Sequence, residues 1–234
     1  MMKTCGVVSA VCLPEESLGM VHRVINRFEL LNDMEVRFIG DQELHNKFLS
    51  SAHYARYHAW NFVPSDVERI IYFDIDMLPL RPLPELPNID FAAAPERQEI
   101  YKECGDAWPV IKRAGLYFNT GMIIATRKTE PIFQRMLYKQ THSTGCESPW
   151  FADQSFFNVE VFAAVEAGEI TFQELPRSWN SLILLDTVNP PPDEPYMIHY
   201  AGGHPSKLRL ITHAITQLTN LERMIDIKKQ YSHG

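Results

Sequence analysis

Short apolar runs alternate along the chain with segments whose apolar residues recur at helical spacing. Residues 6–12 (GVVSAVC), 35–40 (EVRFIG) and 69–80 (RIIYFDIDMLPL) are β-type runs, and the third contains an unbroken apolar stretch typical of a buried strand. Between the first two runs, apolar residues from Met20 to Leu31 recur every three or four positions, which predicts a helix. Alternating strands and helices are the signature of an α/β fold.

The same alternation continues toward the C-terminus. Further β-type runs cover residues 90–95 (DFAAAP), 117–125 (YFNTGMIIA), 169–176 (EITFQELP) and 196–202 (YMIHYAG). Helical patterns cover residues 52–62, 131–139, 153–167 and the tail beyond Pro205. Because no internal repeat or domain linker interrupts this pattern, we expect a single domain over residues 1–234.

Composition narrows the class of protein. The chain has 234 residues, 45% hydrophobic and 22% charged, as expected for a globular protein with one sizeable core. No apolar run approaches the roughly 20 residues that a membrane helix needs, and residues 5–12 are short for a signal peptide. The four cysteines form no C-x-x-C pair, so we expect reduced thiols and a cytoplasmic location. The net charge of −7 disfavours nucleic acid as a partner.

The clearest candidate chemistry follows the buried run in residues 69–80. Asp74 and Asp76 come directly after it, one residue apart. Residues two apart on a strand point to the same side, so both carboxylates are expected at a strand end, where α/β folds bind ligands. Two carboxylates that close repel each other, and a divalent cation such as Mg²⁺ or Mn²⁺ relieves the repulsion while holding substrate phosphate oxygens.

Two other interpretations of this D-x-D pattern stay open on the motif alone. The pattern is common, and its acids can simply cap a turn before Pro79 at a solvated strand end. In a phosphatase of the haloacid dehalogenase type, an apolar strand also ends in D-x-D. There the first Asp is the nucleophile and the second Asp is the general acid. Such phosphatases usually carry Thr or Val shortly after the second acid, whereas Met77, Leu78 and Pro79 follow it here.

Further motifs surround the D-x-D pattern in a fixed order. They are YARYHAW (residues 54–60), YFNTGMIIA (117–125), ADQSFFN (152–158), LPRSWN (175–180) and IHYAGG (198–203). In this order and at these separations the set resembles family 8 of the retaining glycosyltransferases, which includes glycogenin and bacterial lipopolysaccharide galactosyltransferases. The resemblance implies a GT-A fold, with a mostly parallel, Rossmann-like sheet flanked by helices.

The resemblance implies roles for residues in these motifs. Arg56 is expected to bind the donor nucleotide-sugar, and its guanidinium is a rigid donor fork suited to phosphate. Asn119 and Thr120 interrupt an apolar strand, and the resemblance places them at the donor sugar. Asp153 is expected to contact the sugar hydroxyls, and Gln154 to lie at the far face of the reacting carbon, which makes both catalytic.

The resemblance also completes the metal site. Family 8 has a metal-binding His in the pattern H-[FY]-x-G, which here begins at His199 and ends at Gly202. His199, Asp74 and Asp76 are therefore expected to bind Mn²⁺ or Mg²⁺. An imidazole ligand suits Mn²⁺ better than Mg²⁺. Asp74 and Gly202 also belong to the expected donor site.

One position departs from the family pattern. The family's diphosphate-binding Lys comes six residues after the metal-binding His, where this chain has Pro205. Lys207 follows two residues later and takes the role by resemblance, with His204 as the alternative.

These expectations define a reaction and its rivals. The chain is expected to move a sugar from a nucleotide diphosphate-sugar to a hydroxyl of a glycan, glycoprotein or other acceptor. The expected donor is a UDP-sugar. Retention of configuration is implied, and because the amide of Gln154 is a poor nucleophile, we expect attack from the leaving-group face. A non-catalytic sugar-nucleotide binder of the same fold is the main rival. The sequence names neither sugar nor acceptor, leaves a homodimer open, and suggests that residues 96–115 shape specificity.

Overall fold

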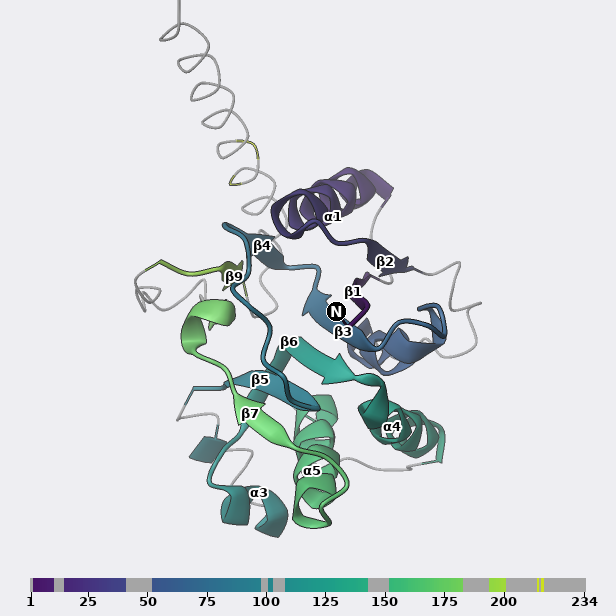
Figure 1. The fold of residues 1–234 in the computed structure, drawn as a ribbon, viewed down its shortest axis with the longest axis vertical. Helices are drawn as coiled ribbons and strands as arrows, with labels where there is room; N and C mark the ends of the chain where they lie inside the picture. The colour runs from purple at the N-terminus through teal and green to yellow at the C-terminus, as the bar shows by residue number, and fades with distance from the viewer. Residues whose placement is uncertain are drawn as a thin grey trace, which may run out of the picture.

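The structure is a computed structural model, which describes residues 2–10, 15–40, 52–97, 101–102, 108–142, 152–182, 194–200, 214 and 216. Its larger sheet contains β1 (Thr4–Ser9), β2 (Val36–Ile39), β3 (Arg69–Asp74), β5 (Phe91–Pro95), β6 (Phe118–Thr126) and β7 (Phe172–Glu174). The strands lie in the order β2-β1-β3-β6-β5-β7, as Figure 1 shows. Each of them overlaps a β-type run of the sequence.

Strand direction in this sheet is mostly parallel. β1 pairs in parallel with β2 and with β3, and β5 pairs in parallel with β7. β6 lies between β3 and β5 and is antiparallel to both. The expectation of a mostly parallel sheet is therefore confirmed, and β6 is the strand that runs the other way.

A smaller sheet joins distant parts of the chain. It contains β4 (Met77–Pro79), β8 (Ser181–Leu182) and β9 (Met197–His199), in the order β4-β9-β8. β4 and β9 are antiparallel, with Met77 directly opposite His199. The backbone N–H of Tyr200 adds a hydrogen bond of 3.0 Å to the carbonyl of Asp76. This pairing places His199 beside the turn that follows β3.

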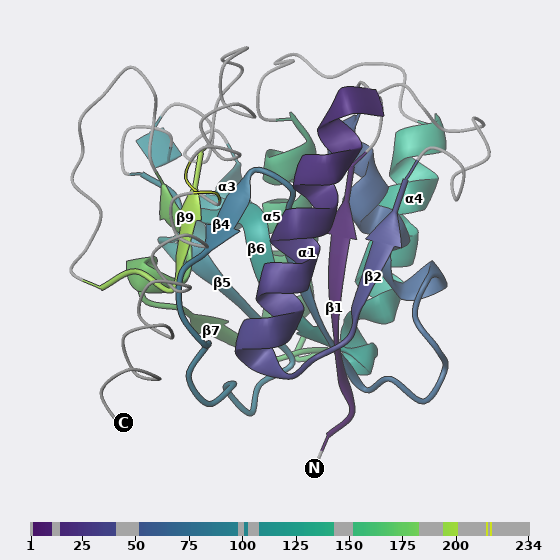
Figure 2. The ribbon, with the colours of Figure 1, turned by 90° about the horizontal axis from the view of Figure 1, so that it is seen from above.

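Helices cover both faces of the larger sheet. They are α1 (Leu18–Asn32), α3 (Pro109–Ala114), α4 (Glu130–His142) and α5 (Ala152–Glu166), with the 3₁₀ helices η1 (Glu15–Ser17), η2 (Ala52–Asn61), η4 (Arg127–Thr129) and η5 (Arg177–Trp179). Figures 1 and 2 show α1 and the smaller sheet on one face, and α3, α4 and α5 on the other. The expected arrangement of a sheet between helical layers is confirmed.

The apolar spacing of α1 explains its packing. Val21, Val24 and Phe28 lie one helical turn apart and are fully buried, while the opposite side of the helix is exposed. Phe28 stacks on Phe73 of β3 with 4.4 Å between ring centroids. Burying a side chain of this size contributes about 1.5–3 kcal/mol, so this stripe is sufficient to fix α1 against the sheet.

Some sequence expectations need correction or fall outside the described residues. Residues 52–62 were expected to form a helix with apolar residues on one side, and the structure has the 3₁₀ helix η2 there. The tail beyond Pro205 lies outside the described residues apart from positions 214 and 216. Among the described residues, no helix is long and apolar enough to cross a membrane. Cys5 is a buried free thiol, and the other cysteines lie outside the described ranges.

Candidate active site

The two acids of the D-x-D pattern lie at the end of β3 and in the turn after it. Asp74 is the last residue of β3, and Ile75 and Asp76 form the turn into β4. Both acids therefore lie at the end of the buried strand, as expected, with Asp76 two residues beyond its last residue. The turn still brings them together with His199, and one ligand atom from each residue lies within 4.8 Å of the other two.

The electrostatics of this triad suit a bound cation. Burial lowers the pKa of His199, but the carboxylate of Asp76, whose Oδ1 is 3.3 Å from Nε2, together with the charges of Asp74 and Glu96, raises that pKa by more. Burial raises the pKa of Asp74, and the charge of Asp76 raises it further against the opposing charge of Arg56. Two carboxylates and one imidazole are a ligand set that Mn²⁺ accepts, and its charge would stabilise both acids in ionised form.

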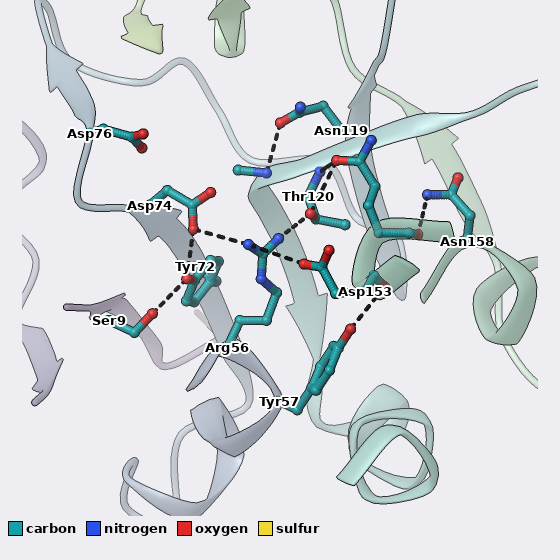
Figure 3. A network of polar contacts seen from close by, with 12 residues as sticks. Ser9, Arg56, Tyr57, Tyr72, Asp74, Asp76, Asn119, Thr120, Asp153 and Asn158 are labelled. Atoms are coloured by element: carbon teal, nitrogen blue, oxygen red, sulfur yellow. Dashed lines mark hydrogen bonds and ion pairs between the residues drawn. The ribbon is translucent and has the colours of Figure 1, made fainter. Parts of the chain in front are cut away.

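Arg56 is the centre of a second cluster beside the triad (Figure 3). Its side chain comes from η2 and is 4% exposed. Its Nη2 lies 3.6 Å from Asp74 Oδ1 and 3.7 Å from Asp153 Oδ2, and its Nη1 donates to the hydroxyl of Thr120. Burial lowers the pKa of Arg56, but the surrounding acids raise it by more, so the guanidinium stays charged. One buried cation thus links two acids from separate elements.

Tyr72 holds Asp74 from the other side. Its hydroxyl donates a 2.7 Å hydrogen bond to Asp74 Oδ1 and lies 2.7 Å from the hydroxyl of Ser9 at the end of β1. Burial, followed by the charge of Asp74, raises the pKa of Tyr72 well above its ordinary value, so the phenol keeps its proton. Sequence reasoning missed Tyr72, although a hydroxyl within the apolar run of residues 70–73 was the available signal.

The start of β6 holds the third group of polar side chains. The Oε1 atom of Gln154 accepts a 3.0 Å hydrogen bond from the backbone N–H of Thr120. Its Nε2 atom donates to Glu96 Oε2 at 3.2 Å, and Asn119 Nδ2 donates to the same oxygen at 2.6 Å. Gln154, Asn119 and Glu96 are all buried, so these hydrogen bonds satisfy polar groups that are largely withdrawn from solvent.

A further asparagine connects this group to the triad. Asn180, which follows η5, donates from Nδ2 to Asn119 Oδ1 at 2.8 Å, and its Oδ1 lies 3.0 Å from His199 Nδ1. Gly121 is required at this place, because a Cβ there would lie 2.3 Å from His199 Cε1. The glycine of the N-T-G motif therefore makes room for the imidazole.

Most of the expected site residues belong to one continuous network. The structure brings together Arg56, Asp74, Asp76, Asn119, Thr120, Asp153, Gln154 and His199 through the contacts described above. Gly202, His204 and Lys207 lie outside the described residues. Glu96 was expected only as the first residue of the specificity segment 96–115, and Asn180 only as part of a motif, so neither was assigned a role in the site. Glu96 directly follows the buried strand β5, as Asp74 ends β3, and Asn180 ends the motif LPRSWN.

A polar cavity of about 260 Å³ adjoins this network. Glu96 lines it together with Tyr101, Tyr117, Glu174 and Arg177. Tyr101 belongs to the segment of residues 96–115 that we expected to shape specificity. The carboxylate of Glu96 thus lies between the buried amides and an accessible polar space.

Solved structures with a similar architecture identify the fold. A galactosyltransferase LgtC, solved with donor and acceptor sugar analogs, is 16% identical with a TM-score of 0.57, covering 92% of this chain and 95% of its own. A glycosyltransferase involved in the glycosylation of the major capsid of PBCV-1 is 11% identical, with a TM-score of 0.58, and the match covers 89% of this chain and 99% of that one. Mouse xyloside xylosyltransferase 1 is 15% identical with a TM-score of 0.54, covering 88% and 99%. The fold is the GT-A fold of glycosyltransferases.

The family follows from a match over most of the chain. The family model described as Glycosyl transferase family 8 matches residues 16–207. The chain therefore belongs to glycosyl transferase family 8, as the ordered motifs predicted, and this membership removes the phosphatase alternative. A comparison with curated protein sequences finds no match.

Proposed function

We propose that this glycosyltransferase moves a sugar from a UDP-sugar to an acceptor hydroxyl, with a divalent cation, Mn²⁺ or Mg²⁺, and with retention of configuration. The observation that carries the proposal is the triad of Asp74, Asp76 and His199, whose ligand atoms lie within 4.8 Å of one another in a family 8 chain. The triad comes from a strand end, a turn and a strand of the smaller sheet. When bound, the cation would neutralise charge on the departing diphosphate.

The residues around the triad support a donor site. Arg56 holds Asp74 and Asp153 on either side of its guanidinium, so both carboxylates have fixed positions. We propose that Asp153 binds sugar hydroxyls, because carboxylates accept hydrogen bonds from them strongly. We extend the donor site to Asn119 and Thr120 on β6 and to Gly202. Lys207, or His204 in its place, is proposed to bind the diphosphate.

Retention is supported by the chemistry of Gln154. Its amide is neutral and is bonded through Oε1 to Thr120 and through Nε2 to Glu96, so it offers no strong nucleophile. If the acceptor hydroxyl attacks from the same face that the diphosphate leaves, the enzyme needs no nucleophile of its own. The anomeric configuration of the product, read by NMR, tests this step, and an inverted product would contradict it.

The transfer itself is tested by turnover with a charge-matched control. Purified protein is incubated with a panel of UDP-sugars, with and without Mn²⁺ and with and without a panel of sugar acceptors, and released UDP is measured, so that both transfer and hydrolysis by water are detected. We expect Mn²⁺-dependent release with at least one sugar and a loss on the order of 100-fold or more in Asp76→Asn. Asp66→Asn removes the same charge from an exposed ion pair with Lys3 and should leave the rate unchanged.

The same experiment separates the rival function. Binding of a UDP-sugar in a thermal-shift assay, without release of UDP under any condition, would identify a non-catalytic binder and contradict the proposal. Failure of every nucleotide-sugar to stabilise the protein, with or without Mn²⁺, would contradict the donor site as a whole.

A further inference from the structure

A buried line of side chains runs from Glu96 to His199. It passes through Asn119 and Asn180, with donor–acceptor distances of 2.6, 2.8 and 3.0 Å. The four residues are 8%, 6%, 2% and 5% exposed, respectively. The direction of each hydrogen bond along this line is fixed by neighbouring groups that can only donate or only accept.

The first direction is set by a backbone group. The N–H of Gly121 is a donor and cannot accept, and it lies 2.7 Å from the Oδ1 position of Asn119. The atom at that position must therefore be the amide oxygen. The NH₂ of Asn119 then faces Glu96, whose carboxylate accepts from it.

A second backbone group fixes the neighbouring amide in the same way. The N–H of Thr120 faces Gln154 Oε1 at 3.0 Å, which leaves the Gln154 NH₂ pointing at Glu96 Oε2. These backbone donors bond to side chains at a point where the pairing of β6 with β5 is irregular, between Ala93 and Pro95. The Oε2 atom of Glu96 thus accepts hydrogen bonds from the NH₂ groups of both Asn119 and Gln154.

The order continues through Asn180 to the imidazole. Asn119 Oδ1 accepts, so the Asn180 atom facing it is the NH₂ group, and the Asn180 oxygen faces His199 Nδ1. A carbonyl oxygen only accepts, so Nδ1 must carry a hydrogen. The other ring nitrogen, Nε2, is the one directed toward Asp76 and the triad.

We propose that Glu96, Asn119 and Asn180 are positioning residues that hold His199 in the Nδ1–H tautomer and so present the lone pair of Nε2 to a divalent cation. This inference deepens the proposed function and rests on it for the identity of the triad as a cation site. It gives Glu96 a role in both the cation site and the placing of Gln154. Outer partners of metal-binding His residues commonly contribute about 10–100-fold in metal affinity, which sets the expected effect.

The tautomer is read directly in the metal-free protein. Full-length protein is labelled with ¹⁵N in its histidine rings, and two-bond ¹H–¹⁵N spectra are recorded with His199→Asn identifying the signals of His199. Because Asp76 favours a second proton on the ring, a pH series is recorded and the neutral form is read at its alkaline end. We expect the Nδ1–H form alone. A spectrum of the Nε2–H form, or of a mixture of both, would overturn the proposal.

Two pairs of variants test the chain of bonds by Mn²⁺ affinity, measured by electron paramagnetic resonance. Asn180→Leu should bind Mn²⁺ about 10-fold or more weakly, whereas Asn32→Leu, which also loses two hydrogen bonds in the α1 region, should bind normally. Glu96→Leu should lose affinity similarly, and Glu96→Gln should restore it to within about threefold, because its amide oxygen still accepts. Unchanged affinity in both leucine variants at positions 96 and 180 would refute the proposal.

The outcomes separate this inference from the function on which it rests. The tautomer spectrum needs neither cation nor substrate, and the Mn²⁺ titration needs no turnover. An Nδ1–H tautomer with affinity losses in the two variants supports the positioning roles even in a protein that transfers no sugar. Normal transfer with an Nε2–H tautomer retains the proposed function and overturns the positioning roles.

Discussion

The substitution Gly121→Ala would create a steric clash with His199, a residue of the candidate cation site. A Cβ at this position would lie 2.3 Å from His199 Cε1, 2.6 Å from His199 Nδ1 and 2.8 Å from Asn119 Oδ1. Ordinary contacts of a Cβ begin near 3.4 Å, so the imidazole has to move by roughly 1 Å. The ring is buried and bonded to Asn180, which leaves no free direction for a small adjustment.

The size of the effect follows from the precision that metal ligands need. Ligand distances in metal sites hold to within about 0.2 Å, so a shift of this size removes His199 from the ligand set. We expect Mn²⁺ affinity to fall on the order of 100-fold, which is about 2.7 kcal/mol. Crowding of the buried side chains should also lower the free energy of unfolding by about 1–3 kcal/mol.

Isothermal titration of Mn²⁺ into the metal-free protein measures the loss, with thermal unfolding as a check of folding. Gly19→Ala is the matched control, because a Cβ on that exposed position of α1 meets nothing within 4 Å. It should leave Mn²⁺ affinity unchanged, and because Gly19 is in the first turn of α1, it should change stability by no more than about 0.5 kcal/mol. A folded Gly121→Ala protein that binds Mn²⁺ within about threefold of the parent would refute the placement of His199 as a ligand.

Three further substitutions test the polar clusters by urea unfolding and Mn²⁺ titration. Tyr72→Phe removes the hydroxyl that donates to Asp74 and should cost about 1–2 kcal/mol of stability and weaken Mn²⁺ binding. Arg56→Met leaves the carboxylates of Asp74 and Asp153 without their shared cation and should cost about 2 kcal/mol or more, with a smaller loss at acidic pH. Burial raises the pKa of Asp90, but hydrogen bonds from Thr171 and Lys128 lower it by more, so the pKa lies below its ordinary value. These bonds to the ionised carboxylate should contribute about 1 kcal/mol to the free energy of unfolding. The contribution should be full above about pH 4 and should disappear as pH falls through the lowered pKa. Asp90→Asn should accordingly be destabilised at pH 7 and match the parent in strong acid, and equal stability at pH 7 would contradict this assignment.

The fold was predictable where burial follows the local period of the sequence. The unbroken apolar run before Asp74 forms β3, buried on both faces, and the stripe from Met20 to Phe28 forms the buried side of α1. The direction of β6 was not predictable, because a strand with the same apolar pattern can pair in either sense. The 3₁₀ form of η2 was hidden for a related reason, since apolar residues three and four apart suit both helical periods over a short segment.

The candidate site was predictable where one side chain carries the chemistry. Asp74, Asp76 and His199 were named from the sequence, and the structure places their ligand atoms together. Glu96 and Asn180 were not assigned individual roles, because their importance lies in hydrogen bonds to partners far away in the sequence. The sequence does not show which way a side-chain amide is oriented. Here the backbone N–H groups of β6 fix the orientation, because each must face an amide oxygen.

The central claim is that Asp74, Asp76 and His199 hold a divalent cation against the diphosphate of a nucleotide-sugar donor. Crystals grown with Mn²⁺ and UDP, measured at the manganese absorption edge, test it most directly through the anomalous difference map. The account predicts a peak bonded to carboxylate oxygens of both acids, to Nε2 of His199 and to the oxygens of UDP. A manganese peak held by other side chains, or UDP bound with no manganese peak beside these residues, would contradict it.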